Sequence, residues 1–333
     1  MTKKILLLLL FFGFTTTFSQ NNYLDFDGTN DNVDILNSGN AVASATAITL
    51  SCKVFPKSTT MGFPNFNGFA GYRNETNFDF YLIQLSATQV EARFRNSANV
   101  AYSLTYNGLV LNQWNHFFLV YDGTTLKMYS GTTLVTSTPA SGSAPAVNTS
   151  TLKIGLVQFQ SFNWYHNGYI DEVSLWNKGL TSTEIAAIIA NNGEIANPLI
   201  ETNLKLYYKF NQGIPYGVNT GLMSLTDEKA TNNGTLINFA LTGTSSNWGS
   251  QTMSNSDFNS EKGYVFPNPT SNILNFTGFS DITYIKIVDL SNRIIIDNKI
   301  NAMQEATINV SELQSGVYFA VINNTKKIKF IKK

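Results

Sequence analysis

Cysteine and histidine are scarce in this chain of 333 residues, which contains one cysteine, Cys52, and two histidines, His116 and His166. A single cysteine excludes an intramolecular disulfide, so stability must come from the burial of apolar side chains. Cys52 lies in an apolar run, which predicts a core position rather than a nucleophile. The histidines lack a zinc-binding spacing such as His-Glu-x-x-His, and Gly-x-Ser-x-Gly and phosphate-binding loops are absent. These absences favour a protein without catalytic activity.

Charged residues are also few, at 13% of the chain, and the 22 lysines and arginines balance the 22 aspartates and glutamates. No basic patch occurs before the last residues, so we predict no nucleic-acid partner. Asparagine, serine, threonine, glycine and aromatic residues are abundant instead. This composition is typical of an extracellular β protein.

Long apolar runs are absent except at the start of the chain. Lys3 and Lys4 precede the apolar run Ile5–Phe14, and small polar residues follow it, which is the order of a secretory signal peptide. The run is shorter than the roughly 20 residues that a membrane helix needs. We therefore predict a signal peptide over residues 1–19, a mature chain that begins at Gln20, and a secreted or outer cell-surface location.

Apolar and polar residues alternate in many short segments, which predicts half-buried β-strands. The clearest of these segments are residues 48–55, 80–85, 90–95, 116–121, 126–129 and 169–176. Turn-forming pairs such as Asp122-Gly123 separate them, and the spacing indicates an antiparallel sandwich. One helix is predicted over residues 181–190, where Thr181 and Glu184 form a capping box. The fold class is therefore predicted to be all-β.

The length of the chain predicts more than one domain, because about 310 mature residues exceed what one compact core usually holds. The polar segment 251–262 has no periodic pattern and is predicted to be a linker. Residues 263–333 contain enough short β patterns for a small Ig-like β-sandwich. Residues 198–250 also contain strand and turn patterns, but they are too few for a complete second module. We predict that they form a β extension packed on the first sandwich.

Several motifs follow one another in the first part of the chain. They are Leu24–Gly28 with Asp31, Gln113–His116 before Val120–Thr124, Leu126–Tyr129, Leu152–Gly155, and Asn167–Trp176 before the helix at Thr181. In their order and spacing they resemble the laminin-G-like, concanavalin A-like jelly-roll modules of secreted bacterial proteins. The resemblance implies an antiparallel jelly-roll β-sandwich over residues 20–197.

A second set of motifs lies near the end of the chain, in residues 264–274, 285–293, 309–319 and 327–333. These segments resemble the C-terminal sorting domain of type IX secretion in Bacteroidetes. The resemblance implies recognition by the type IX secretion machinery, and attachment to the outer-membrane surface, or release, after processing of the C-terminus. The residues that would carry this signal are Pro267, Asn268, Pro269, Gly316, Tyr318, Lys327 and Lys329. Pro267 and Pro269 predict an extended entry, while the final lysines would also protect an exposed sheet edge.

Two loops, residues 61–72 and 157–166, combine aromatic with amide side chains. Rings that stack on sugars, beside amides that bond to hydroxyls, are suited to binding carbohydrate. Alternatively, the rings plug the ends of the sandwich. The candidate ligand-binding residues are Trp164, Tyr165, Phe162, Phe66 and Tyr72. Trp114 and Trp176 are predicted to lie in the core.

The segment Tyr23–Leu36 contains four aspartates and two asparagines. It does not fit an EF-hand, because Asn32 and Ser38 occupy the positions that require glycine and glutamate. The resemblance to laminin-G-like modules nevertheless implies a structural calcium ion held by residues from separate loops. The candidate ligands are Asp27, Asn30, Asp31 and Asp171. Aspartate, asparagine and glycine are also ordinary turn residues, so a simple hairpin turn remains the alternative.

The concanavalin A-like fold also includes glycosidases, which need two carboxyl groups that face one cleft. The most suggestive pair, Asp171 and Glu172, is adjacent in a strand, so the two side chains should point to opposite faces unless a bulge intervenes. We therefore predict a non-catalytic protein that binds a glycan or an extracellular matrix ligand. The alternatives are a structural adhesin that recognises a protein, and a glycoside hydrolase.

Overall fold

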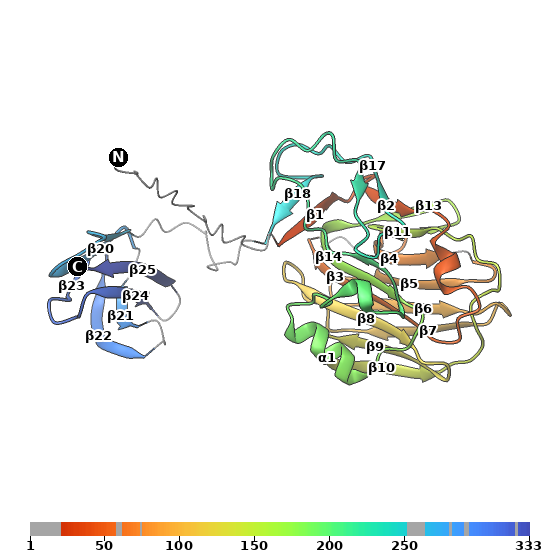
Figure 1. The fold of residues 1–333 in the computed structure, drawn as a ribbon, viewed down its shortest axis with the longest axis horizontal. Helices are drawn as coiled ribbons and strands as arrows, with labels where there is room; N and C mark the ends of the chain where they lie inside the picture. Colours follow the sequence, from red (N-terminus) through yellow and green to blue (C-terminus); the bar gives the residue numbers. More distant parts are fainter. Residues whose placement is uncertain are drawn as a thin grey trace, which may run out of the picture. The chain divides into compact units, whose positions relative to one another are not determined.

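The computed structural model describes residues 21–57, 62–73, 75–251, 264–279, 282–289, 293–323 and 326–333. The predicted signal peptide and most of the predicted linker lie outside these residues. The chain divides into two compact units, Met1–Gln251 and Thr252–Lys333 (Figure 1). Among the helices described, none has the length and apolar character required to cross a membrane.

The first unit is a sandwich of two antiparallel eight-stranded sheets, which we call sheet A and sheet B. The strand order in sheet A is β10-β9-β8-β3-β14-β1-β18, and β15 pairs with β14. These strands are β1 (Asn22–Asp27), β3 (Ile48–Pro56), β8 (Asn115–Tyr121), β9 (Thr125–Ser130), β10 (Thr133–Pro139), β14 (Asn167–Trp176), β15 (Leu204–Tyr208) and β18 (Trp248–Ser250). The predicted all-β sandwich is confirmed.

The strand order in sheet B is β16-β17-β2-β11-β4-β5-β6-β7. Its strands are β2 (Asn32–Ile35), β4 (Asn67–Arg73), β5 (Asp79–Gln84), β6 (Val90–Arg95), β7 (Ala101–Tyr106), β11 (Leu152–Ile154), β16 (Ser224–Leu225) and β17 (Gly234–Ile237). The alternation in β6 sends Val90, Ala92 and Phe94 into the core, so that Glu91, Arg93 and Arg95 lie on the outer face. The sequence pattern thus determines which side chains a ligand could reach on this sheet.

A hairpin of β12 (Leu156–Phe159) and β13 (Phe162–Tyr165) lies over the outer face of sheet B. Val157 and Trp164 of the hairpin pack on Tyr81 and Ile83 of β5 in a small apolar cluster. The two aromatic loops predicted from the sequence therefore meet on this face.

Helix α1 (Ser182–Ala190) begins with the predicted capping box between Thr181 and Glu184. Its Ile185 and Ile188 pack on side chains of the outer face of sheet A, including Phe118 and Trp176. The predicted burial of Trp176 is confirmed. Short 3-10 helices occur at Ser38–Val42 (η1) and Pro198–Ile200 (η2).

Residues 198–250 contribute strands to both layers of the sandwich. β15 pairs with β14 and β18 with β1 in sheet A, while β17 pairs with β2 in sheet B. The segment therefore completes the sheets of the first unit.

The second unit is a smaller sandwich with its own core. The strand orders are β19-β20-β23 in one sheet and β22-β21-β24-β25 in the other. The strands are β19 (Tyr264–Phe266), β20 (Ile273–Thr277), β21 (Ile282–Val288), β22 (Ile294–Met303), β23 (Ala306–Asn309), β24 (Gly316–Ile322) and β25 (Lys326–Lys332). Residues 267–269 form a bend after β19, so the predicted extended entry is wrong.

Candidate ligand-binding surface

Asp27 ends β1, and Asn30 and Asp31 lie in the turn between β1 and β2. The Asp27 carboxylate accepts hydrogen bonds from the backbone N–H groups of Thr29 and Asn30, at 2.7 and 3.3 Å. Asp31 Oδ2 accepts a third from the backbone N–H of Asp27, at 3.1 Å. The turn thus uses its carboxylates to bind its own backbone, as an ordinary Asx turn does.

Asp171 lies apart from this turn. Asp27 pairs with Asn167, so Asp171 is four residues further along β14, roughly 14 Å at 3.4 Å per residue. Asp171 is fully buried, and its Oδ2 accepts a 2.7 Å bond from Gln251 Nε2 and lies 3.4 Å from Lys53 Nζ. In the part of the chain that is described, no three His, Cys, Asp or Glu residues are grouped to hold a metal ion. The four predicted ligands do not fit one calcium site.

Two of the predicted ligand-binding residues lie too deep to contact a ligand directly. Trp164 is only 5% exposed, and its Nε1 donates a 2.9 Å hydrogen bond to the carbonyl oxygen of Pro64. Tyr72 is fully buried in the main core. For these two residues, the structure matches the alternative in which the rings plug the sandwich.

Four other aromatic residues are partly exposed, two on the hairpin and two on the segment before β4. We define the aromatic rim as Phe63, Phe66, Phe162 and Tyr165. Phe63 is 60% exposed and meets Phe162 edge to face, with ring centroids 4.9 Å apart. The exposed amides of Gln158 and Asn163 hydrogen-bond to each other beside the rim, at 2.9 Å. The rim retains the combination of rings and amides that the sequence predicts.

Beside the hairpin, the outer face of sheet B bears Arg73, Arg93 and Arg95, which we call the arginine face. Arg95 Nε lies 2.8 Å and Arg93 Nε 3.5 Å from Oδ2 of Asp79, whose side chain is fully buried. Tyr81 accepts a 2.6 Å hydrogen bond from Arg73 and donates a 2.8 Å bond to Glu91. Burial raises the pKa of the Tyr81 hydroxyl above its usual range. These residues were missed in the sequence, although the alternation of Glu91, Arg93 and Arg95 was visible there.

Arg73 connects the arginine face to the hairpin. Its guanidinium carbon lies 4.4, 5.1 and 5.5 Å from the ring centroids of Phe159, Tyr81 and Trp164. Such stacking fixes a planar group of donors against aromatic faces. The arrangement can donate hydrogen bonds to hydroxyl or carboxylate oxygens from the sheet while exposed rings stack on an apolar face of the same ligand.

The adjacent pair Asp171 and Glu172 does not alternate as expected, because β14 has a bulge between Asp171 and Ser174 and Glu172 has a φ of 50°. Glu172 accepts a hydrogen bond from Tyr207, which packs among the side chains beneath α1. Both carboxyl groups are buried, and desolvation raises the pKa of Asp171 to about 7 and that of Glu172 well above its usual range. Neither group is exposed to a substrate.

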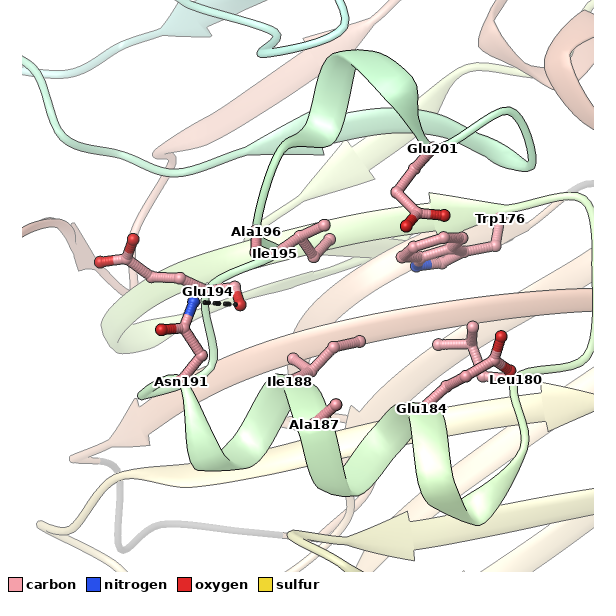
Figure 2. Close-up of a pocket in the computed structure, with 10 residues that line it drawn as sticks. All are labelled: Trp176, Leu180, Glu184, Ala187, Ile188, Asn191, Glu194, Ile195, Ala196 and Glu201. Atoms are coloured by element: carbon pink, nitrogen blue, oxygen red, sulfur yellow. Dashed lines mark hydrogen bonds between the residues drawn. The ribbon is translucent and has the colours of Figure 1, made fainter.

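A cavity of about 180 Å³ lies between α1 and residues 194–201, lined by Trp176, Glu184, Glu194 and Glu201 (Figure 2). Figure 2 shows the Glu194 carboxylate pointing away from the other two. Glu194 lies 2.7 Å from Lys209, and Glu184 is held by Lys178 and by the helix cap. Two of the three carboxylates that line the cavity are therefore committed to structural contacts. The cavity is also smaller than the roughly 300 Å³ at which ligand pockets begin.

The predicted sorting residues gather around β25 in the second unit. Asn268 donates to the carbonyl oxygen of Lys329 at 3.1 Å and accepts from the backbone N–H of Ile331 at 2.9 Å, so it ties the proline bend to this strand. Gly316 begins β24, and Tyr318 stacks on Phe330 with centroids 5.8 Å apart. Lys327 and Lys329 are exposed on the edge strand β25.

Two segments match family models. Residues 27–186 match the concanavalin A-like lectin/glucanases superfamily, and residues 264–333 match the secretion system C-terminal sorting domain. The chain thus contains a concanavalin A-like segment followed by a segment that matches a sorting domain. Both matches confirm the resemblances predicted from the sequence, to concanavalin A-like modules over residues 27–186 and to the sorting domain over residues 264–333. No curated protein matches the chain.

Comparison with solved structures finds similarities to parts of this chain at low sequence identity. A candidate carbohydrate-binding protein from Bacteroides ovatus is 17% identical, with a TM-score of 0.47, over 66% of this chain and 58% of its own length. A heptameric SAP-like pentraxin from Limulus polyphemus is 14% identical, with a TM-score of 0.42, over 53% and 85%. The CBM40 domain of a Ruminococcus gnavus sialidase, bound to α2,3-sialyllactose, is 14% identical, with a TM-score of 0.39, over 50% and 97%.

Proposed function

We propose that this chain is an exported, non-catalytic protein that binds glycans at the aromatic rim and the arginine face. Membership of residues 27–186 in a superfamily of lectins and glucanases supports carbohydrate as the ligand class. The sorting domain supports export by the type IX secretion machinery to the cell surface or the medium. The burial of Asp171 and Glu172 supports binding rather than hydrolysis. The expected ligand is a glycan outside the cell or a component of an extracellular matrix.

The observation that carries this proposal is the position of Arg73 between the two parts of the surface. Its guanidinium stacks on Phe159 of the hairpin and bonds to Tyr81 of sheet B. Fixed aromatic faces and fixed polar donors therefore lie side by side on one outer face. A binding site with this composition matches the apolar face and the hydroxyl edge of a pyranose ring.

The test is a glycan array with the purified chain and the variants Phe63→Ala and Arg93→Ala. Phe63→Ala is expected to weaken binding roughly five-fold, because one aromatic contact contributes about 1 kcal/mol. Arg93→Ala removes a donor that is 25% exposed and is expected to weaken binding by a similar factor. Val147→Ala, at an exposed apolar position outside the proposed surface, serves as the control. Full binding by both Phe63→Ala and Arg93→Ala would contradict the proposal.

Recognition of a protein is the second candidate function, and a loop of the 198–250 segment favours it. Ile214 and Val218 are 64% and 72% exposed. Asn219 holds this loop through hydrogen bonds to the backbone of Ile214 and to the buried side chain of Asn247. Exposed aliphatic side chains on a fixed backbone suit a protein partner. Loss of adhesion to protein-coated surfaces in Ile214→Ser, with unchanged glycan binding, would favour this alternative.

A further inference from the structure

Four aromatic side chains gather on the outer face of sheet A, and we call them the aromatic platform: Tyr23, Phe55, Trp114 and Tyr169. Phe55 and Tyr169 are directly opposite each other in β3 and β14, with ring centroids 4.9 Å apart. Tyr23 stacks on Tyr169 at 4.1 Å, and Trp114 lies 5.6 Å from Phe55. The solvent side of an antiparallel sheet is ordinarily polar, so a cluster of this kind requires an explanation.

Other parts of the first unit bury Tyr23, which is 5% exposed, but leave the other three rings of the platform partly exposed. Helix α1 covers the region of sheet A around Phe118 and Trp176. The rings of Phe55, Trp114 and Tyr169 remain half-buried, and none of the described apolar core clusters includes them. The predicted core position of Trp114 is therefore wrong. Its place directly before the core strand β8 made it resemble a core residue in the sequence.

The backbone beside the platform is adapted to its rings. Gly249 of β18 pairs with Tyr23, and a Cβ atom at Gly249 would lie 2.3 Å from the Tyr23 ring. Only glycine leaves room for this ring to lie along the sheet and reach Tyr169. The Tyr23 hydroxyl is also fixed, at 2.9 Å from the hydroxyl of Tyr216. The platform is thus a fixed surface before any ligand arrives.

Two lysines give the platform a positive outer surface. Lys57 Nζ lies 3.7 Å from the centre of the Tyr169 ring and 3.1 Å from Asp25, and Lys53 Nζ lies 5.1 Å from the Trp114 ring and 3.4 Å from Asp171. The lysine side chains are 31% and 12% exposed, while the side chains of Asp25 and Asp171 are 5% and 0% exposed. In each pair the lysine is the more exposed partner, so the pair presents its positive member to an arriving ligand.

Burial strengthens this asymmetry. It raises the pKa of Asp25 to about 6 and that of Asp171 to about 7, against the attraction of Lys57 and Lys53. Near neutral pH the Asp171 carboxyl group is therefore partly protonated and neutralises Lys53 only in part.

We propose that the aromatic platform is a second glycan-binding surface, specific for acidic polysaccharides whose pyranose rings stack on Trp114 while their carboxylates pair with Lys57 and Lys53. Stacking and charge pairing together distinguish this ligand class from a neutral glycan. The inference rests on the proposed function only for the general class of ligand. The aromatic platform lies on sheet A, whereas the arginine face lies on sheet B.

The experiment is affinity electrophoresis of the purified full chain in gels that contain polygalacturonate, alginate or hyaluronate. A fourth gel contains highly methyl-esterified pectin, which has the same galacturonate rings as polygalacturonate but little charge. The variants are Trp114→Ala, Lys57→Gln and, for the aromatic rim, Phe63→Ala. Val147→Ala is the control, and thermal melting establishes that each variant is folded.

At least one acidic polymer is expected to retard the parent chain more than the methyl-esterified pectin does. Trp114→Ala should weaken this binding roughly ten-fold, and Lys57→Gln should weaken binding to the acidic polymer but not to the ester. Losses in these two variants, with Phe63→Ala unchanged, support the platform and show that acidic polymers bind there rather than on sheet B. Loss only in Phe63→Ala overturns the platform but leaves the proposed function intact. Absence of retardation by all three acidic polymers also overturns the platform.

Discussion

The carboxyl group of Asp171 is fully buried on the outer face of sheet A, with Lys53 Nζ 3.4 Å away. Desolvation raises its pKa to about 7, although Lys53 opposes this shift. The folded state therefore holds a proton that the unfolded chain, with an aspartate pKa of about 3.9, releases at lower pH. The proton on Asp171 therefore stabilises the folded state. This stabilisation is complete below about pH 4 and is lost as the pH rises through about 7.

Asp171→Asn removes this titration while keeping an oxygen that can accept the hydrogen bonds. The parent loses stability between pH 5 and pH 8, and the variant does not share this loss. We therefore expect the melting temperature of the variant to rise relative to that of the parent by roughly 3 °C or more over this range. Thermal denaturation of both proteins across this range measures the difference. A constant difference would show that the pKa of Asp171 is not raised by folding.

Single residues also show where prediction from the sequence stops. Alternation placed Glu91, Arg93 and Arg95 on one face, because a regular strand fixes the direction of each side chain. The same rule failed at Glu172, where the bulge in β14 places a non-glycine residue at positive φ. It also could not separate Trp164, which is buried under its own hairpin, from the exposed Phe63. Burial of loop residues depends on tertiary contacts that local patterns do not contain.

At the scale of elements, strands and turns with strong local patterns were predicted correctly. The capping box at Thr181 and the alternating strands of both sheets follow from local sequence. The calcium hypothesis required something further, namely that the turn after β1 lies beside Asp171 of β14. Strand register decides this question, and Asp27 pairs with Asn167 instead. Register depends on the whole sheet, so the local cluster of aspartates could not reveal it.

The turn between β1 and β2 is expected to be stable without a metal ion. The carboxylates of Asp27 and Asp31 already accept backbone hydrogen bonds within the turn. Melting temperatures measured with calcium and with excess chelator at pH 7 should therefore agree within error. Asp31→Asn provides a comparison, because an ion held at this turn would make only the parent sensitive to chelator. A clear fall in the melting temperature of the parent with chelator would restore the calcium hypothesis.

At the scale of the whole molecule, each of the two units has its own apolar core. Neither core depends on side chains from the other unit, so binding and export can be assigned to separate parts of the chain. The residues of the proposed binding surfaces all lie in the first unit, and the predicted sorting residues all lie in the second. This division matches the two family models, which cover residues 27–186 and 264–333.

Deletion of residues 267–333 is therefore expected to leave a folded β-sandwich that remains in the periplasm. Cell fractionation and surface immunolabelling with an antibody against the first unit measure its location. Asn268→Ala is the finer test, because Asn268 makes two hydrogen bonds that hold the proline bend against β25. It should reduce export without changing glycan binding by the purified protein, since that surface belongs to the other unit. Normal surface display of the truncated chain would show that this domain is not the export signal.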